Sequence, residues 1–456
     1  MMKRIVTISM MTMLMFALSM NMTLAKVSEQ EVQKLNKELT PMGSVRQGNA
    51  EGTIPEWTGG VISPPSEYKT GMYHPYPFKK DEKILTITKD NVDQLKEKLT
   101  PGQLAMFKTY PNTYKMYVYP THRTASYPKD VYDAFLFNAS NAIMINDGNG
   151  FNNARMTSPF PMPQNGLEAI WNHIARFRGV MLARYGSQAA PAQDGSYTIM
   201  KMEELAHMVY ATVGLTAEQL NEKNMLIYFK QWVTAPARLA GTALLVHEFI
   251  DQIKQPRQAW TYNAGQRRVR RAPDVAYDSP GTAADGLRTT DDFDVFCGAP
   301  DRYTWTLVGK KEIYIPYNDY TLHSNQLKND DIIKAGHINQ EHARYELHRV
   351  WVVEANLKQG IRHLYKKRVF YLDEDSWQAV LEDIYDDRDQ LWRVYEAHPI
   401  NYYEIPMIWT TLDVIYDLQA GRYLAGGLDN ETKPPDFSVK LDENEFTPAS
   451  LRRSGH

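Results

Sequence analysis

The sequence predicts a mainly β (α+β) protein built on one large, curled antiparallel sheet with covering helices. From about residue 180 onward, short aromatic and β-branched segments alternate with turn signals at regular spacing, which is typical of antiparallel strands. The clear helical patterns, in contrast, lie before Ala175. The 28 tyrosines and 9 tryptophans suit a sheet or a cavity wall, because such side chains bury large areas while keeping one polar edge.

The N-terminus has the pattern of a secretory signal peptide. Lys3 and Arg4 precede an apolar run over 5–18, and small residues end at Ala25. We expect cleavage after Ala25 and no lipid anchor, because no cysteine lies at the cut. The alternative is a transmembrane anchor, which needs about 20 apolar residues. The pattern therefore predicts an exported protein.

Composition narrows the compartment and the partners. The only cysteine, Cys297, allows no internal disulfide, which fits the bacterial periplasm better than a disulfide-rich secreted scaffold. The formal charge of −3 gives no reason to expect nucleic acid. We expect three regions: the signal peptide at 1–25, a helix and irregular arm packed on the body at 26–87, and the β-rich domain with its helical lid at 88–456.

The arm begins with a helical pattern over 26–39. The following stretch, 39–65, is rich in Gly and Pro and has no helical or strand period. Met42, Ile54 and Trp57 are apolar residues within it. We therefore expect the arm to pack against the body instead of forming a free linker.

Four further segments have helical signals. Thr88 is a candidate N-cap for a helix that carries Val92, Leu95 and Leu99. The run from Thr100 to Gln103 has the pattern of a capping box with proline at the first helical position. Segments 127–141 and 164–175 place apolar residues on one helical face.

Strands are predicted over the rest of the chain. The Asp194-Gly195 turn joins segments 180–193 and 196–210, and the second of these could also be helical. A second hairpin pairs 225–234 with 239–249, and 258–272 continues the meander as a third strand. The later strands, which bring the count to about ten, are 303–317, 345–357, 363–373, 379–387, 390–398 and 407–418.

The densest basic cluster contains Arg267, Arg268, Arg270 and Arg271. On a strand, Arg268 and Arg270 share one face. They form a candidate anion or headgroup site, because arginine binds phosphate and carboxylate in a bidentate manner. The alternative is a belt of ion pairs, which we favour because five aspartates follow closely at 274, 278, 291, 292 and 294.

No motif predicts catalysis, a metal or a cofactor. His247-Glu248 does not continue as HExxH, and His342 and His348 are six residues apart, which is not a facing helical spacing. There is no G-x-S-x-G elbow and no phosphate-binding glycine loop. A pair of carboxylates of the kind found in glycosidases stays an open alternative, although no sequence feature favours one.

The aromatic strand residues are the remaining signal. Trp305 and Trp351 lie mid-strand among apolar neighbours two residues away, as does Val353, and Trp260 lies with Tyr262. The default interpretation is an ordinary core. A wide apolar sheet face must, however, be covered or bind a ligand. We therefore hypothesise that Trp305, Trp351, Trp260 and Val353 line a ligand cavity under a lid formed by the helices before Ala175.

Long motifs resemble one family of exported Gram-negative proteins. They are LTPMGSVRQGNAEGTIPEWTGG, GQRRVRRAPDVAYDSP, LRTTDDFDVFCGAPDRYTWTLVGKKEIYIPYN, YELHRVWVVEA and RVFYLDEDSW. The family is a domain-of-unknown-function family labelled outer-membrane lipoprotein-sorting protein. The resemblance implies a fold similar to the lipoprotein carrier LolA and its receptor LolB, which is an unclosed β-barrel with helices over its concave face. It also implies gene neighbours that encode a resistance-nodulation-division (RND) transporter and an outer-membrane barrel.

Two classes of function follow, with a third alternative. The first is a periplasmic carrier for a lipid or other hydrophobic ligand, which needs a cavity and no catalytic group. The second is an envelope hydrolase, which needs a polar cluster inside the cavity. The third is a structural adaptor between the transporter and the outer membrane. The carrier is the prediction, since no catalytic motif is present.

Overall fold

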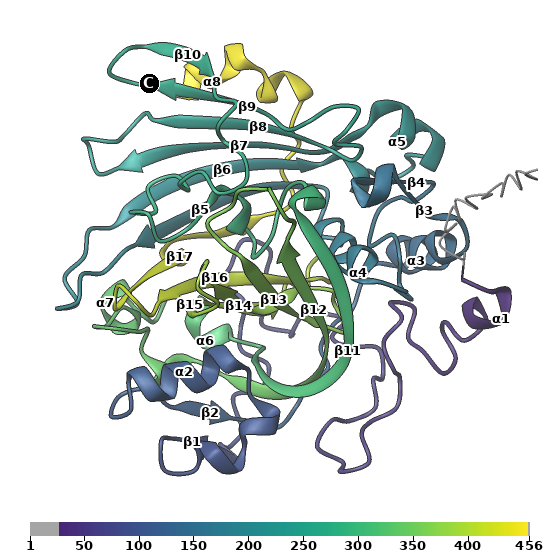
Figure 1. Cartoon of the computed structure of the whole chain (residues 1–456), viewed down its shortest axis with the longest axis vertical. Coiled ribbons are helices and arrows are strands. Elements are labelled where there is room, and N and C mark those ends of the chain that lie inside the picture. The colour runs from purple at the N-terminus through teal and green to yellow at the C-terminus, as the bar shows by residue number, and fades with distance from the viewer. Residues whose placement is uncertain (1–26, 455–456) are drawn as a thin grey trace, which may run out of the picture.

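The computed structural model describes residues 27–454 and places most strands in one sheet (Figure 1). The strand order is β1-β2-β12-β13-β14-β15-β16-β17-β5-β6-β7-β8-β9-β10, with β11 paired to β12. Among the described residues, β1 and β10 do not pair with each other, so the sheet is not closed. Its neighbouring strands are antiparallel except for one contact between β2 and β12. The predicted large, open antiparallel sheet is confirmed.

The central strand of the sheet is β17 (Arg422–Asp436). The strands of the upper half of Figure 1 are β5 (Met181–Ala189), β6 (Met200–Met208), β7 (Met225–Ala235), β8 (Ala243–Phe249), β9 (Gln258–Asn263) and β10 (Arg268–Arg271). The strands of the lower half are β1 (Leu85–Ile87), β2 (Met116–Val118), β11 (Tyr303–Pro316), β12 (Tyr345–Leu357), β13 (Lys367–Asp373), β14 (Ala379–Tyr385), β15 (Leu391–Asn401) and β16 (Ile408–Asp417). A separate hairpin contains β3 (Ile143–Ile145) and β4 (Gly150–Asn152).

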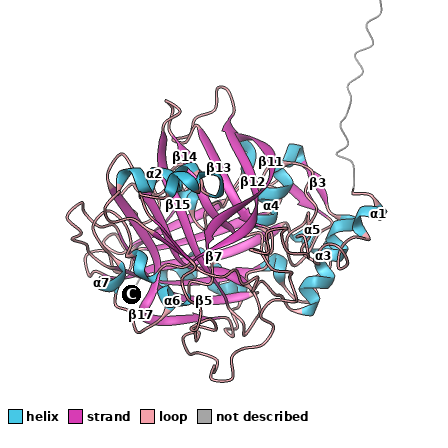
Figure 2. Cartoon of the chain, turned by 90° about the horizontal axis from the view of Figure 1, so that it is seen from below, coloured by secondary structure: helices cyan, strands magenta, loops and turns pink. Residues whose placement is uncertain are grey.

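The α-helices are short and lie around the sheet (Figure 2). They are α1 (Glu29–Val32), α2 (Pro101–Thr109), α3 (Lys129–Asn141), α4 (Gly166–Ile174), α5 (Ala217–Lys223), α6 (Tyr320–His323), α7 (Asn329–Ile332) and α8 (Pro448–Ser454). Within residues 27–454, no helix combines the length and apolar character that crossing a membrane requires. The predicted signal peptide lies outside the described residues.

The central strands are buried on both faces. Tyr395 on β15 joins the largest core cluster, whereas its neighbour Val394 joins a second cluster. Alternate residues of a strand point to opposite faces, so the two clusters lie on opposite sides of the sheet. Helix α2 packs on the second side through Met106 and Phe107, and α4 packs on the first side through Trp171.

Local signals predicted α2, α3 and α4 well. Thr100 and Gln103 form the expected capping box, and Pro101 begins the helix. Two other expected helices are shorter or absent. The segment 26–39 is helical only over Glu29–Val32, and the chain turns at Asn36, which has a positive φ of 62°. The segment after Thr88 forms two 3-10 turns, Val92–Gln94 and Lys96–Lys98.

The irregular arm lies against the body of the molecule. Met42 and Ile54 are buried, and Trp57 is 6% exposed. The Trp57 indole donates from Nε1 to the Ala125 carbonyl at 2.9 Å, and the Trp377 indole donates to the Met42 carbonyl at 3.0 Å. Hydrogen bonds therefore anchor the arm at two points in addition to its apolar contacts.

The short strands β1 to β4 were not predicted, and the later strand predictions differ from the structure at two further places. Segment 258–272 is a hairpin of β9 and β10 instead of one strand, because the chain turns near Arg267, which has a positive φ. The second difference is β17, which sequence analysis did not predict. It contains Gly426, Gly427, Pro434 and Pro435, residues that normally mark turns, yet it joins the two halves of the sheet by pairing with β16 and β5.

Candidate functional site

A mostly apolar cavity of about 140 Å³ lies on one face of β5 to β8. The pairing register explains its wall: Ala206 on β6 lies opposite Phe229 on β7, which lies opposite Val246 on β8. Residues two positions along each strand point the same way. The strand residues of the wall are Leu182, Glu204, Ala206, Met208, Leu226, Ile227, Phe229, Gln231, Leu244, Val246, Glu248 and Trp409.

The segment 275–298 covers this cavity and is named here the covering segment. It contributes Val275, Pro280–Thr282, Arg288, Thr290, Phe293 and Phe296–Gly298 to the lining. The helices before Ala175 were expected to form the lid, but they contribute only Ile174 to this lining. Helix α4 instead packs on β11 and β12. The close approach depends on Gly166, since a Cβ there would lie 2.8 Å from the β11 backbone.

The wall of the cavity carries a polar cluster. Arg257 donates from Nε to Oε2 of Glu248 at 2.5 Å, and its Nη2 lies 3.4 Å from Sγ of Cys297. Burial raises the pKa of Glu248, and Arg257 opposes that shift. The cluster is a neutralised pair in an apolar wall, so it gives the cavity a polar patch without a free charge.

A second cluster holds the covering segment to the body. Arg176 donates to Oδ1 of Asp294 at 2.6 Å, Arg178 pairs with Oδ2, and the Trp409 indole donates to Oδ1 at 3.2 Å. Burial alone would raise the pKa of Asp294, but Arg176 and Arg178 hold it well below the usual range. Asp294 is thus an ionised anchor that fixes the covering segment over the cavity.

The lining of this cavity does not include three predicted residues, Trp305, Trp351 and Val353. They lie on the same side of the sheet as the cavity, in or against the largest core cluster. Trp305 is 8% exposed and packs edge-on against Phe296, which does line the cavity. Trp351 stacks on Trp377 with centroids 6.2 Å apart. These residues form packed core beside the cavity, because α4 fills the space in front of β11 and β12.

The fourth predicted residue, Trp260, lies on the opposite face of the sheet. It pairs with Leu245 on β8, whereas Leu244 and Val246 line the cavity. Its ring contacts His247, with centroids 4.9 Å apart, and it packs with Leu451 of α8 in a separate cluster. Trp260 is therefore not part of this cavity wall.

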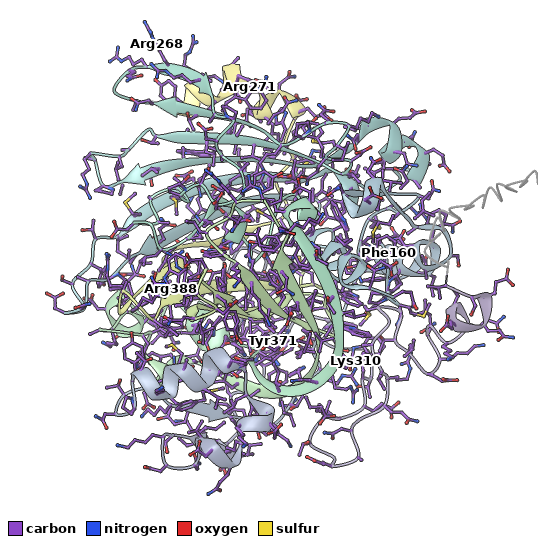
Figure 3. The ribbon with its side chains drawn as sticks, in the orientation of Figure 1. Phe160, Arg268, Arg271, Lys310, Tyr371 and Arg388 are labelled. Carbon is purple, nitrogen blue, oxygen red and sulfur yellow. The ribbon has the colours of Figure 1, made fainter. Side chains whose placement is uncertain are left out.

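The basic cluster does not form the expected belt of ion pairs. All four arginines are exposed on or beside β10, and none of them has an ion pair among the described residues. Figure 3 shows Arg268 and Arg271 at the end of the sheet, pointing away from the body. The nearby aspartates bind other arginines: Asp278 pairs with Arg302, and Asp292 pairs with Arg368. The edge is a free basic surface.

His348, Asp373 and Asp375 come together as a buried group that sequence spacing did not indicate. His348 Nδ1 lies 3.7 Å from Asp373 Oδ1. Both oxygens of Asp375, however, accept hydrogen bonds from Arg123, at 2.7 and 2.8 Å. A guanidinium group already neutralises this carboxylate, so the arrangement is a buried hydrogen-bonded network.

Sequence analysis missed Trp409 and the wall of β6 to β8. The signal was present as alternation: Trp409, Thr411, Asp413 and Ile415 share one face of β16, and three of them line hollows. The covering segment had no such signal, because it is irregular between β10 and β11.

These features define an open antiparallel β-sheet protein with one mostly apolar cavity beneath an irregular covering segment. The chain belongs to the family described as "Protein of unknown function (DUF1329)", whose model matches residues 86–452. It is 52% identical over 433 residues to the uncharacterized protein PA3922 of Pseudomonas aeruginosa, covering 95% of each chain. The family membership predicted from the long motifs is confirmed.

Solved structures with related topology have low sequence identity. A putative outer membrane lipoprotein-sorting protein domain from Vibrio parahaemolyticus is 16% identical, with a TM-score of 0.44, over 63% of this chain and 98% of that one. A DUF1329 family protein from Desulfovibrio piger is 14% identical, with a TM-score of 0.42, over 60% and 92%.

Proposed function

We propose that this protein is a periplasmic carrier that binds a hydrophobic ligand between β5–β8 and the covering segment. The observation that carries the proposal is the apolar wall made by Ala206, Phe229 and Val246. An apolar cavity of about 140 Å³ costs stability if it stays empty, since its lining lacks contacts. A comparable engineered cavity of roughly 150 Å³ binds benzene. The space suits an aromatic ring or a short alkyl chain.

The polar groups of the lining support a carrier over the alternative of a hydrolase. Among the residues that line the cavity, none is a histidine. Glu248 is held by Arg257, and Glu204 accepts a hydrogen bond from Gln231 at 2.6 Å. A hydrolase needs a base or nucleophile free to meet its substrate. Both carboxylates already have partners, and burial raises the pKa of the Cys297 thiol, which disfavours the reactive thiolate.

The test is calorimetric titration with 4-phenylbutan-1-ol, a neutral probe with one ring. Wild-type protein should bind it saturably. Val246→Trp should abolish binding by filling the cavity, whereas Thr234→Trp, an exposed position at the end of β7, should bind like wild type. Circular dichroism and melting curves check that both variants fold. Equal binding by both folded variants, or no binding by wild type, would contradict the carrier.

The periplasmic location and the partners are part of the same proposal. N-terminal sequencing of fractionated protein should find Lys26 as the first residue of the periplasmic form. Cross-linking in cells should capture an RND-type transporter or an outer-membrane barrel protein. Recovery of the intact Met1 form in the inner membrane would contradict the location.

A further inference from the structure

A smaller hollow of about 50 Å³, with a lining more polar than that of the apolar cavity, adjoins that cavity. The two share Glu204, Gln231, Arg288 and Phe293, so they are neighbouring compartments. The hollow also reaches the central strands β15, β16 and β17. A ligand in the cavity therefore meets a second, more polar space at one side.

Arg184 lines this hollow as a buried cation. It is 7% exposed, and its guanidinium group has no hydrogen bond or ion pair with another described residue. Its Nη2 atom is completely buried, and its guanidinium carbon lies 5.0 Å from the centre of the Trp409 ring. A buried guanidinium without a direct hydrogen-bond partner is costly, and here the nearby carboxylates of Glu204 and Asp413 offset that cost, since they raise the pKa of Arg184 against the effect of burial.

The backbone of β17 makes room for this guanidinium. Gly427 has a φ of +87°, and a Cβ there would lie 2.5 Å from Arg184 Nη2 and 2.6 Å from the Thr411 carbonyl oxygen. The pairing of β17 with β5 shifts register between Gly426 and Leu428. A residue with a side chain would thus collide with Arg184, which explains glycine at this point of a central strand.

Arg288 of the covering segment lies at the boundary of the two compartments. It lines both of them, and its guanidinium carbon is 5.5 Å from the centre of the Phe293 ring. Its side chain has no hydrogen bond or ion pair among the described residues, whereas its backbone carbonyl accepts from the Gly281 N–H at 2.9 Å. The nearby Asp294 is occupied by Arg176 and Arg178.

The remaining carboxylates of the hollow do not pair directly with these arginines. Glu204 lies opposite Arg184 in the strand register, yet it accepts its hydrogen bond from Gln231. Asp413 accepts a hydrogen bond from Thr410 at 3.2 Å, and its Oδ1 has no partner. Two guanidinium groups therefore face one small space without a direct ion pair, although Glu204 and Asp413 are near enough to raise the pKa of Arg184.

We infer that the ligand is an amphipathic anion, with its apolar part in the cavity and a carboxylate or phosphate between Arg184 and Arg288. The inference rests on the proposed function. Arginine is suited to this role because its planar fork binds both kinds of oxyanion in a bidentate manner. A charge-assisted hydrogen bond contributes about 1.5–3 kcal/mol, which corresponds to a tenfold or greater change in affinity.

The experiment compares four probes by calorimetry: 4-phenylbutan-1-ol, 4-phenylbutanoate, 4-phenylbutyl phosphate and inorganic phosphate. Wild-type protein should bind one or both organic anions at least about tenfold more tightly than the alcohol. The stronger of the two identifies the headgroup. Arg288→Gln and Arg184→Gln should each remove the preference for the organic anions over the alcohol. Arg388 is exposed and is labelled in Figure 3, so the Arg388→Gln variant should keep the preference for the organic anions.

The outcomes separate the two proposals. If the alcohol binds but the anions bind no better, or if Arg288→Gln keeps the preference, the amphipathic anion is overturned and the carrier stands. Inorganic phosphate that binds as tightly as the phenylbutyl ester overturns it too, because the apolar part would then contribute nothing. If wild-type protein does not bind the alcohol, the proposed function itself fails. Arg288 is half-buried, so its variant stays informative even if the Arg184 variant does not fold.

Discussion

Arg257 and Glu248 form a hydrogen-bonded ion pair in the wall of the cavity, with Nε and Oε2 2.5 Å apart and both side chains less than 10% exposed. Breaking a buried pair by removing one partner leaves an uncompensated charge. The stability of the cavity wall should therefore be sensitive to the loss of either partner.

Arg257→Met should destabilise the protein by about 3–5 kcal/mol at pH 8, because removing one partner of a buried ion pair leaves Glu248 without its counter-charge. Burial already raises the pKa of Glu248. A buried carboxyl with a raised pKa lowers the stability of the folded protein as pH rises through that pKa. The loss of stability caused by Arg257→Met should therefore be smaller at pH 5. Urea denaturation at both pH values measures it. The double variant Arg257→Met, Glu248→Gln should recover most of the loss, and its failure to do so would assign the effect to packing.

Asp383 should make the protein less stable above neutral pH. Its Oδ1 accepts from the Gly102 backbone at 3.0 Å, and its Oδ2 accepts from the Tyr371 hydroxyl at 3.0 Å. Burial nevertheless raises its pKa to about 7. The protonated form is favoured on folding, so stability from this group is complete below about pH 4 and is lost as pH rises to 7.

Asp383→Asn should remove this dependence. Between pH 5 and pH 8, wild-type protein should lose on the order of 2 kcal/mol more than the variant does. Denaturation curves at the two pH values provide the comparison. Asp387→Asn changes an exposed carboxyl on the following turn and should behave like wild type. Identical pH profiles for all three proteins would show that Asp383 stays ionised in the fold.

Trp409 and Trp305 should respond differently to removal. Trp409 lines the cavity, so Trp409→Ala should weaken binding of 4-phenylbutan-1-ol. Trp305 stacks on Phe370 with centroids 5.7 Å apart and donates to the Pro300 carbonyl at 2.8 Å. Trp305→Ala should cost about 3–5 kcal/mol of stability. Calorimetry and urea denaturation of both variants separate the effects. Weaker binding by a stable Trp305→Ala protein would restore Trp305 as a ligand contact.

Arg268 and Arg270 remain a predicted anion or headgroup site at the free edge of the sheet. The doubly substituted Arg268→Gln, Arg270→Gln protein should bind less to vesicles containing anionic phospholipid, and the difference should shrink at high salt because exposed charges are screened. Vesicle sedimentation at two salt concentrations measures both effects. The Arg388→Gln variant serves as the matched control. Unchanged sedimentation of the double variant would show that this edge does not bind anionic surfaces.

The sequence by itself determined those features whose signals are local. The capping box at Thr100 and Gln103 marks the start of α2, because its hydrogen bonds join residues three apart. The period of two in the aromatic segments identifies most strands, and the Asp194-Gly195 turn joins β5 and β6. The long motifs established the family.

Tertiary structure decided which strands face a ligand. Trp305 and Trp409 are both strand tryptophans on the same side of the sheet, but α4 packs in front of the first and the covering segment leaves a space in front of the second. Arg184 becomes a candidate binding residue only because Gly427, more than 200 positions away, makes room for its guanidinium. Such contacts depend on how distant segments fold over one another. Local spacing carries no information about them, and the same spacing is compatible with a filled core or with a cavity.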